Sequence, residues 1–172
     1  AVAAKSDRVK MLDLGPTTEG HRMIAAAVSS AENIRNLERI RATNARLADP
    51  RALEPDEARR LASTQKVILA IGASIHASEV GATQAASELL YTLVTASDTS
   101  TLAVLDNVVT VIIPSLNPDG ERLVNAWYER TKGTPYEGGV MPWLYQKYAG
   151  HDINRDAFMM NLVENRNLAT FM

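Results

Sequence analysis

The chain of 172 residues has an ordinary globular composition, with 46% hydrophobic and 22% charged residues. Its net charge of −2 and its 5% aromatic content provide neither a basic footprint nor a stacking surface for nucleic acid. The absence of cysteine excludes disulfides, thiolate catalysis and cysteine metal sites. No apolar stretch reaches the roughly 18 residues of a membrane span. The opening AVAAKSDRVK fits the remainder of a removed leader, so we expect an extracytoplasmic location.

The first third of the chain predicts two strands and a helix. Residues 7–15 and 21–29 are short apolar runs separated by PTTEG, which predicts a strand–turn–strand unit. Residues 29–50 predict a helix, because Ser29 and Glu32 form a capping-box pattern ahead of a partial apolar stripe.

The middle of the chain alternates between helical and strand patterns. Residues 55–64 predict a short helix that begins at a proline, and residues 66–74 form an apolar run typical of a strand covered on both faces. Residues 80–95 carry an unbroken apolar series at helical spacing, and residues 107–116 predict another buried strand. A strand, a helix and a strand in succession imply a parallel pair and therefore an α/β sheet. Beyond residue 120 we expect a long loop and then a final helix near residue 166.

His76 and Glu79 stand where the predicted strand 66–74 gives way to the predicted helix 80–95. Ligands of open α/β sheets bind beyond the carboxyl ends of the strands. An imidazole nitrogen and a carboxylate oxygen are both good zinc ligands, and a three-residue spacing lets them converge on one ion. The alternative is a histidine that caps the following helix or hydrogen-bonds Glu79 at the surface. The pair alone leaves both interpretations open.

The NPDG sequence at 117–120 follows a predicted strand and suits a turn. Asn117 and Asp119 can accept hydrogen bonds from backbone donors, and Gly120 is expected at a positive φ.

The HDINRD sequence at 151–156 follows a loop rich in glycine and proline. The guanidinium of Arg155 and the amide of Asn154 are well matched to a carboxylate ligand. A salt bridge from Arg155 to Asp152 or Asp156 is an equally good explanation.

Taken together and in chain order, these three stretches resemble the motifs of the zinc carboxypeptidase family. The shared features are H-x-x-E after a strand, here IHASE, NPDG after a strand, here IIPSLNPDG, and an aspartate two residues before Asn-Arg, here HDINRD. The matched span runs from about residue 66 to 158. The resemblance implies an α/β fold with a mixed, mostly parallel sheet flanked by helices. Residues 1–172 would form the N-terminal part of one such catalytic domain, which is therefore incomplete here.

The resemblance also implies roles for individual residues. His76 and Glu79 match the family's first two zinc ligands. Asp152 matches a carboxylate that hydrogen-bonds the ligand histidine and fixes its tautomer. Asn154 and Arg155 match the pair that grips the terminal carboxylate of the substrate.

A further arginine of the family polarises the scissile carbonyl and stabilises the oxyanion. Arg130, in WYERTKG, is the better match, and Arg122 is the alternative. The implied activity is that of a metallocarboxypeptidase, in which a zinc-bound water attacks a peptide bond near the C-terminus while a glutamate acts as general base. The implied cofactor is Zn²⁺, and the implied partner is a peptide or a peptide-like amide.

The sequence departs from the family pattern at its end. The family's third zinc ligand is a histidine tens of residues beyond Asn-Arg, and its general base comes later still, but no histidine follows His151 and the chain ends at Met172. His151 itself is a poor substitute, because its neighbours match the carboxylate-binding motif. We therefore expect these residues to be inactive alone, and an uncovered sheet edge to favour self-association.

Smaller departures bear on the substrate. Val80 and Gly81 follow Glu79 where many digestive members have a bulky aromatic residue, and Asp156 stands where those members have an amide. The pattern is similar to bacterial, non-digestive members, which suggests modified or cell-wall peptides. Two alternative functions stay open: a non-catalytic module that binds a carboxylate or peptide, and a zinc-dependent deacylase or amidase.

Overall fold

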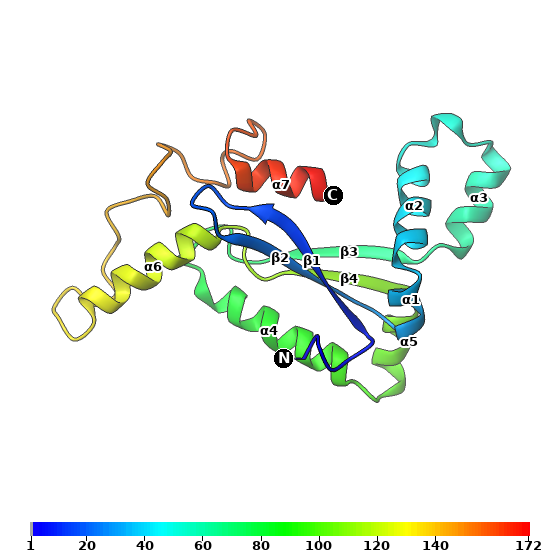
Figure 1. The fold of residues 1–172 in the computed structure, drawn as a ribbon, viewed down its shortest axis with the longest axis horizontal. Coiled ribbons are helices and arrows are strands. Elements are labelled where there is room, and N and C mark those ends of the chain that lie inside the picture. The colour runs from blue at the N-terminus through cyan, green and yellow to red at the C-terminus, as the bar shows by residue number, and fades with distance from the viewer. Residues whose placement is uncertain (1) are drawn as a thin grey trace. The chain divides into compact units, whose positions relative to one another are not determined.

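The computed structural model describes residues 2–172, so Ala1, the first residue of the suggested leader remnant, lies outside the described part. Within residues 2–172, no helix combines the length and apolar character needed to cross a bilayer. The helices and strands shown in Figure 1 are, in chain order, β1 (Val9–Pro16), β2 (Arg22–Val28), α1 (Ala31–Arg35), α2 (Leu37–Ala48), a 3-10 turn (Pro50–Ala52), α3 (Pro55–Thr64), β3 (Val67–Gly72), α4 (Val80–Thr95), α5 (Thr99–Asn107), β4 (Val108–Ile113), α6 (Pro118–Thr131) and α7 (Val163–Phe171).

The four strands form one mixed sheet in the order β1-β2-β4-β3. β2 and β4 are antiparallel, with Ala26 opposite Ile112. Just beyond β3, Ala73 donates its backbone N–H to Ile113 and accepts from the N–H of Leu116, the staggered pattern of parallel neighbours. The predicted α/β class with a mixed sheet flanked by helices is confirmed.

The chain packs as two compact units. The first holds the residues up to Met11 together with 26–71 and 89–112. Its most deeply buried side chains come from β2, α2, α5 and β4, and they are Val28, Ile40, Leu105 and Val109.

The helix predicted over 29–50 begins at Ala31 and is interrupted. Ser30 caps α1 by accepting a hydrogen bond from the Asn33 N–H, and the chain leaves helical geometry at Asn36 before α2. Ser29 cannot cap the helix, because its side chain is fully buried and its hydroxyl lies 2.7 Å from the carbonyl oxygen of Leu105, to which it donates.

β3 contradicts the prediction of a strand covered on both faces. Three of its apolar side chains are substantially exposed, with Val67 at 59%, Leu69 at 48% and Ile71 at 37%. β3 is the edge strand of the sheet, so these side chains lack a neighbouring strand on one side.

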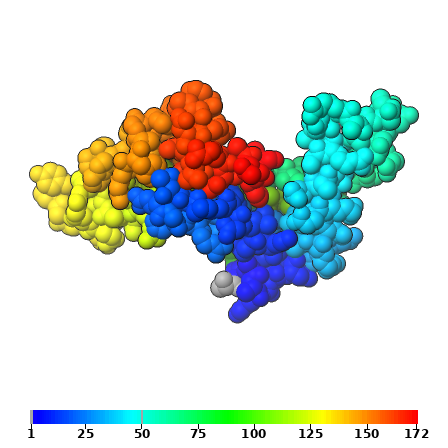
Figure 2. All heavy atoms as spheres, turned by 45° about the horizontal axis from the view of Figure 1, so that its top comes forward, coloured from blue at the N-terminus to red at the C-terminus, as the bar shows by residue number. Residues whose placement is uncertain are grey.

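The second unit holds residues 12–25, 72–88 and 113–172, and it contains every residue of the candidate site. Figures 1 and 2 both show α7 beside the turn between β1 and β2. Asn167 donates from its side chain to the carbonyl of Pro16 at 2.7 Å, and the N–H of Thr18 donates to Glu164 at 2.8 Å. The buried apolar side chains of this unit include Met23, Ile113, Ile153 and Leu162.

Candidate metal centre

A tight turn after β3 places His76 and Glu79. The backbone N–H of Glu79 donates to the carbonyl of His76 at 2.9 Å. Ser74, at a φ of 48°, donates from its hydroxyl to the carbonyl of Glu79 at 2.8 Å. The two side chains converge as a result, with His76 Nδ1 3.2 Å from Glu79 Oε1. Two ligands that each lie about 2.1 Å from a tetrahedral zinc ion are about 3.4 Å apart, so the pair fits Zn²⁺.

The other nitrogen of the ring faces Asp152. His76 Nε2 lies 3.3 Å from Asp152 Oδ2. A carboxylate at that distance favours a proton on Nε2, which leaves the Nδ1 lone pair directed at Glu79. Two acceptors at 3.2 Å repel each other unless a cation or a second proton lies between them. A zinc ligand pair satisfies this geometry, and so does a ring that carries a proton on Nδ1 and donates it to Glu79.

The turn that contains Asp152 also presents Asn154. The Asn154 N–H donates to Asp152 Oδ1 at 2.6 Å, and its side-chain nitrogen lies 3.4 Å from His76 Nε2. The Arg155 N–H donates to the carbonyl of Asp152 at 3.0 Å, while the residue itself is exposed. Within the described residues no salt bridge joins Arg155 to an aspartate, so its guanidinium is available to a ligand.

Asp156 ties this turn to the start of α7. Its side chain is fully buried and accepts hydrogen bonds from the N–H groups of Asn161 and Leu162, from the Asn165 amide and from His151 Nε2. Burial alone raises the pKa of Asp156, but these hydrogen bonds outweigh it and lower the pKa to about 2. The contact also occupies His151 Nε2 at 2.9 Å.

The NPDG sequence begins a helix instead of forming an isolated turn. Asn117 accepts from the Gly120 N–H at 3.0 Å and caps α6, whose first residue is Pro118. The expected positive φ at Gly120 is wrong, because Gly120 is helical. Glycine is needed there for space, because a Cβ would collide with the carbonyl oxygen of Tyr145.

Asp119 anchors a polar network that the sequence did not predict. It accepts from the Thr17 hydroxyl at 2.6 Å, from the Glu19 N–H at 2.9 Å and from His21 Nδ1 at 2.7 Å. Burial raises the pKa of Asp119, but the bonds from Thr17 and His21 outweigh it and hold the pKa below its usual value. Glu19, His21 and Asp119 have ligand atoms within 4.8 Å of one another, yet protein donors already use the Asp119 oxygens. We interpret this group as structural.

Neither candidate for the carbonyl-polarising arginine contacts the His76–Glu79 pair. The Arg130 guanidinium lies over the ring of Trp127, 4.6 Å from its centroid, in the last turn of α6. Arg122 lines a shallow cavity near His21. The structure therefore brings together four of the predicted residues, His76, Glu79, Asp152 and Asn154, and it leaves both arginines outside their direct contacts.

Comparisons with known proteins show the family and the fold of the chain. The sequence model of the zinc carboxypeptidase family matches residues 1–168. The chain belongs to the zinc carboxypeptidase family. No curated protein sequence matched the chain. Among solved structures, a metallo-carboxypeptidase from Burkholderia cenocepacia is similar, with a TM-score of 0.57, 18% identity, and coverage of 95% of this chain and 32% of the other.

A second solved structure, carboxypeptidase A from Helicoverpa armigera, gives a TM-score of 0.54 at 14% identity. That alignment covers 99% of this chain and 39% of the other. At these identities the likeness shows a shared fold. The chain thus has the fold of the zinc carboxypeptidases while spanning well under half the length of either structure.

Proposed function

We propose that this chain provides the first part of a zinc site in a metallocarboxypeptidase-like hydrolase that cleaves a peptide bond near a C-terminus. The observation that carries the proposal is the asymmetric environment of His76, with Asp152 at Nε2 and Glu79 at Nδ1. A ring protonated at Nε2 presents a lone pair beside a carboxylate, which is the donor set of a zinc centre.

Each residue of the site has a distinct task. His76 and Glu79 would hold the metal, and Asp152 keeps the proton on Nε2 so that Nδ1 can coordinate. When bound, zinc supplies Lewis acidity and lowers the pKa of its water. Asn154 and the exposed Arg155 would orient the terminal carboxylate of the peptide through charge-assisted hydrogen bonds.

Arg130 would stabilise negative charge on the scissile carbonyl oxygen. Since it rests on Trp127, this role requires its side chain to turn away from that ring when substrate binds. A catalytic zinc usually has three protein ligands, and His76 and Glu79 provide two. We propose that a further part of the protein supplies the third ligand and the general base.

Zinc content of the full-length protein tests the proposal. His76→Ala and Glu79→Gln should each abolish stoichiometric zinc measured by plasma mass spectrometry, and Asp152→Ala should weaken zinc binding about 10–100-fold. His21→Ala is the matched control, because it removes a histidine from the Asp119 network and should leave zinc bound. Zinc that persists in His76→Ala and disappears in His21→Ala would place the metal in the other cluster and refute the proposal.

Hydrolysis of peptides distinguishes the remaining functions. The zinc-loaded protein should release the last residue of peptides with a free terminal carboxylate and leave C-terminally amidated copies intact. Zinc binding without hydrolysis of any peptide would favour a deacylase or amidase, and carboxylate binding without zinc would favour a non-catalytic module.

A further inference from the structure

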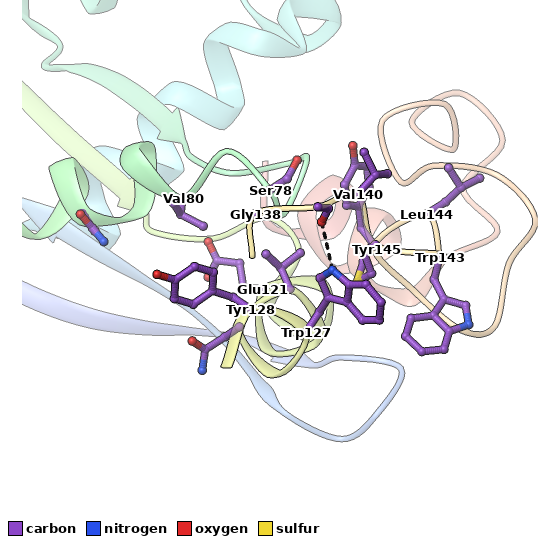
Figure 3. A pocket seen from close by; sticks show the side chains of 15 residues that line it. Ser78, Val80, Glu121, Trp127, Tyr128, Gly138, Val140, Trp143, Leu144 and Tyr145 are labelled. Carbon is purple, nitrogen blue, oxygen red and sulfur yellow. Dashed lines mark hydrogen bonds between the residues drawn. The ribbon is translucent and has the colours of Figure 1, made fainter. Parts of the chain in front are cut away.

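A cavity of about 710 Å³ lies beside the turn that carries His76 and Glu79. Figure 3 shows that its walls come from three segments: the turn before α4, the exposed side of α6, and the loop after α6. The chain contains only two tryptophans, and both line this cavity. Its main side chains are Ser78, Val80, Trp127, Tyr128, Trp143 and Tyr145.

The aromatic wall is fixed by specific contacts. The Trp127 indole donates from Nε1 to the carbonyl of Gly139 at 3.0 Å, which is the dashed line in Figure 3. Trp143 packs against Trp127 edge to face, with ring centroids 6.4 Å apart and an interplanar angle of 85°. Glu121 also lines the cavity, but its carboxylate accepts from the Thr83 hydroxyl. The wall therefore favours an apolar or aromatic guest over a cation.

The cavity adjoins the candidate metal centre on one side only. Ser78 and Val80 flank Glu79 in the chain, and the Tyr145 ring lies 6.0 Å from the His76 ring. Asp152, Asn154 and Arg155 do not line it. The turn proposed to hold the terminal carboxylate therefore lies outside the cavity.

Arg130 connects the cavity to the scissile bond. Its guanidinium covers one face of Trp127, a wall residue. In the proposed function this arginine serves the scissile carbonyl, which belongs to the residue on the N-terminal side of the bond. The cavity has Trp127, the residue under Arg130, in its wall, together with Ser78 and Val80 on either side of Glu79 in the chain. It is therefore placed to receive the side chain of that residue.

We infer that this cavity binds a large apolar or aromatic side chain of the residue that contributes the scissile carbonyl, and so selects the penultimate residue of the peptide. The inference rests on the proposed function for its orientation. Burial of a phenylalanine side chain in place of an alanine methyl group should raise kcat/KM about 10–100-fold.

The test compares two peptides that share a C-terminal residue and carry Phe or Ala before it, using full-length, zinc-loaded protein. The wild-type ratio of kcat/KM should exceed about ten. Trp143→Ala should reduce the ratio at least fivefold, and Val80→Lys, which places a charge on the wall, should reduce it similarly. Tyr136→Ala is the matched control, because Tyr136 is 74% exposed in the same loop and does not line the cavity. A wild-type ratio near one, or an unchanged ratio in both wall variants, would overturn the inference.

A binding measurement separates this inference from the proposed function. Metal-free protein is titrated with N-acetylphenylalanine amide and with N-acetylalanine amide while tryptophan fluorescence is recorded, with Trp143→Phe used to identify the responding indole. A response to the phenylalanine compound alone, in a protein whose zinc-loaded form hydrolyses no peptide, would support the cavity and refute the proposed activity. Hydrolysis accompanied by equal responses to both compounds would refute the cavity alone.

Discussion

Replacing Asp156 with alanine should destabilise the second unit by about 2–4 kcal/mol. The carboxylate accepts from the Leu162 N–H at 2.8 Å, the Asn165 amide at 3.0 Å and His151 Nε2 at 2.9 Å. Leu162 and Asn165 are buried, with exposed fractions of 7% and 5%, so their donors cannot turn to water. Each unsatisfied buried donor costs about 1–3 kcal/mol, and removing a buried charge returns part of that cost.

Thermal unfolding followed by circular dichroism measures this effect. For a protein of this size the expected loss lowers Tm by about 5–15 °C. Asp13→Ala is the matched control, because Asp13 also accepts from a backbone N–H, that of Gly15, but is exposed. Its loss should leave the melting temperature nearly unchanged, because water can replace the bonds of an exposed carboxylate. Equal melting temperatures for the two variants would refute the reasoning that Asp156 holds the loop.

Three further predictions concern acid, glycine and the sheet edge. The pKa of Asp156 is about 2 in the folded protein and about 4 in the unfolded chain. Its contribution to stability is therefore complete above about pH 4 and is lost as the pH falls toward 2. The difference in urea midpoint between wild type and Asp156→Ala should shrink over that range. Gly120→Ala should destabilise the protein by about 2 kcal/mol or more in urea unfolding, because its Cβ would meet the Tyr145 carbonyl. Gly81→Ala is the control, because a Cβ there would have no neighbouring atom within 4 Å. It should be neutral or stabilise α4 by about 0.5–1 kcal/mol. Leu69→Lys should reduce self-association in sedimentation velocity while leaving the circular dichroism spectrum unchanged, and undiminished association would show that β3 is not the contact.

The helices that the sequence predicts best are those whose signals are local. Residues 55–64 and 80–95 coincide with α3 and α4, because a proline at the first position and an apolar period act within a few residues. α6 was missed for a related reason. The residues of NPDG serve a turn and a helix start equally well, and the residues after Gly120 decide which of the two forms.

Exposure could not be predicted in the same way. The apolar run of β3 predicts that its side chains are suited to apolar contacts. Whether those contacts are made depends on the position of β3 at the sheet edge, which the strand order of the whole fold sets.

The candidate site was predictable in its motifs and less so in its surroundings. The pairing of His76 with Asp152 joins residues far apart in sequence and came from resemblance, not from spacing. The overall composition does not predict the aromatic cavity, because a 5% aromatic content is sparse on average, while Trp127, Tyr128, Trp143 and Tyr145 fall within one short segment. That clustering was the available signal. The Asp119 network offered less, since its Thr17 and His21 lie in a stretch with ordinary turn residues.

The single carboxylate at position 156 has a consequence for how this segment can change length. It holds the N–H groups of Asn161 and Leu162, so extra residues inserted between 156 and 161 would separate these donors from their acceptor. The stretch around Gly133 has a comparable bond, from the Gly133 N–H to Glu137 at 2.7 Å, but both residues are exposed, so water can replace that bond. Peptide tags or reporter epitopes should therefore be accommodated beside Gly133 and rejected after Asp156, which makes the two loops unequal as engineering sites despite their similar irregularity.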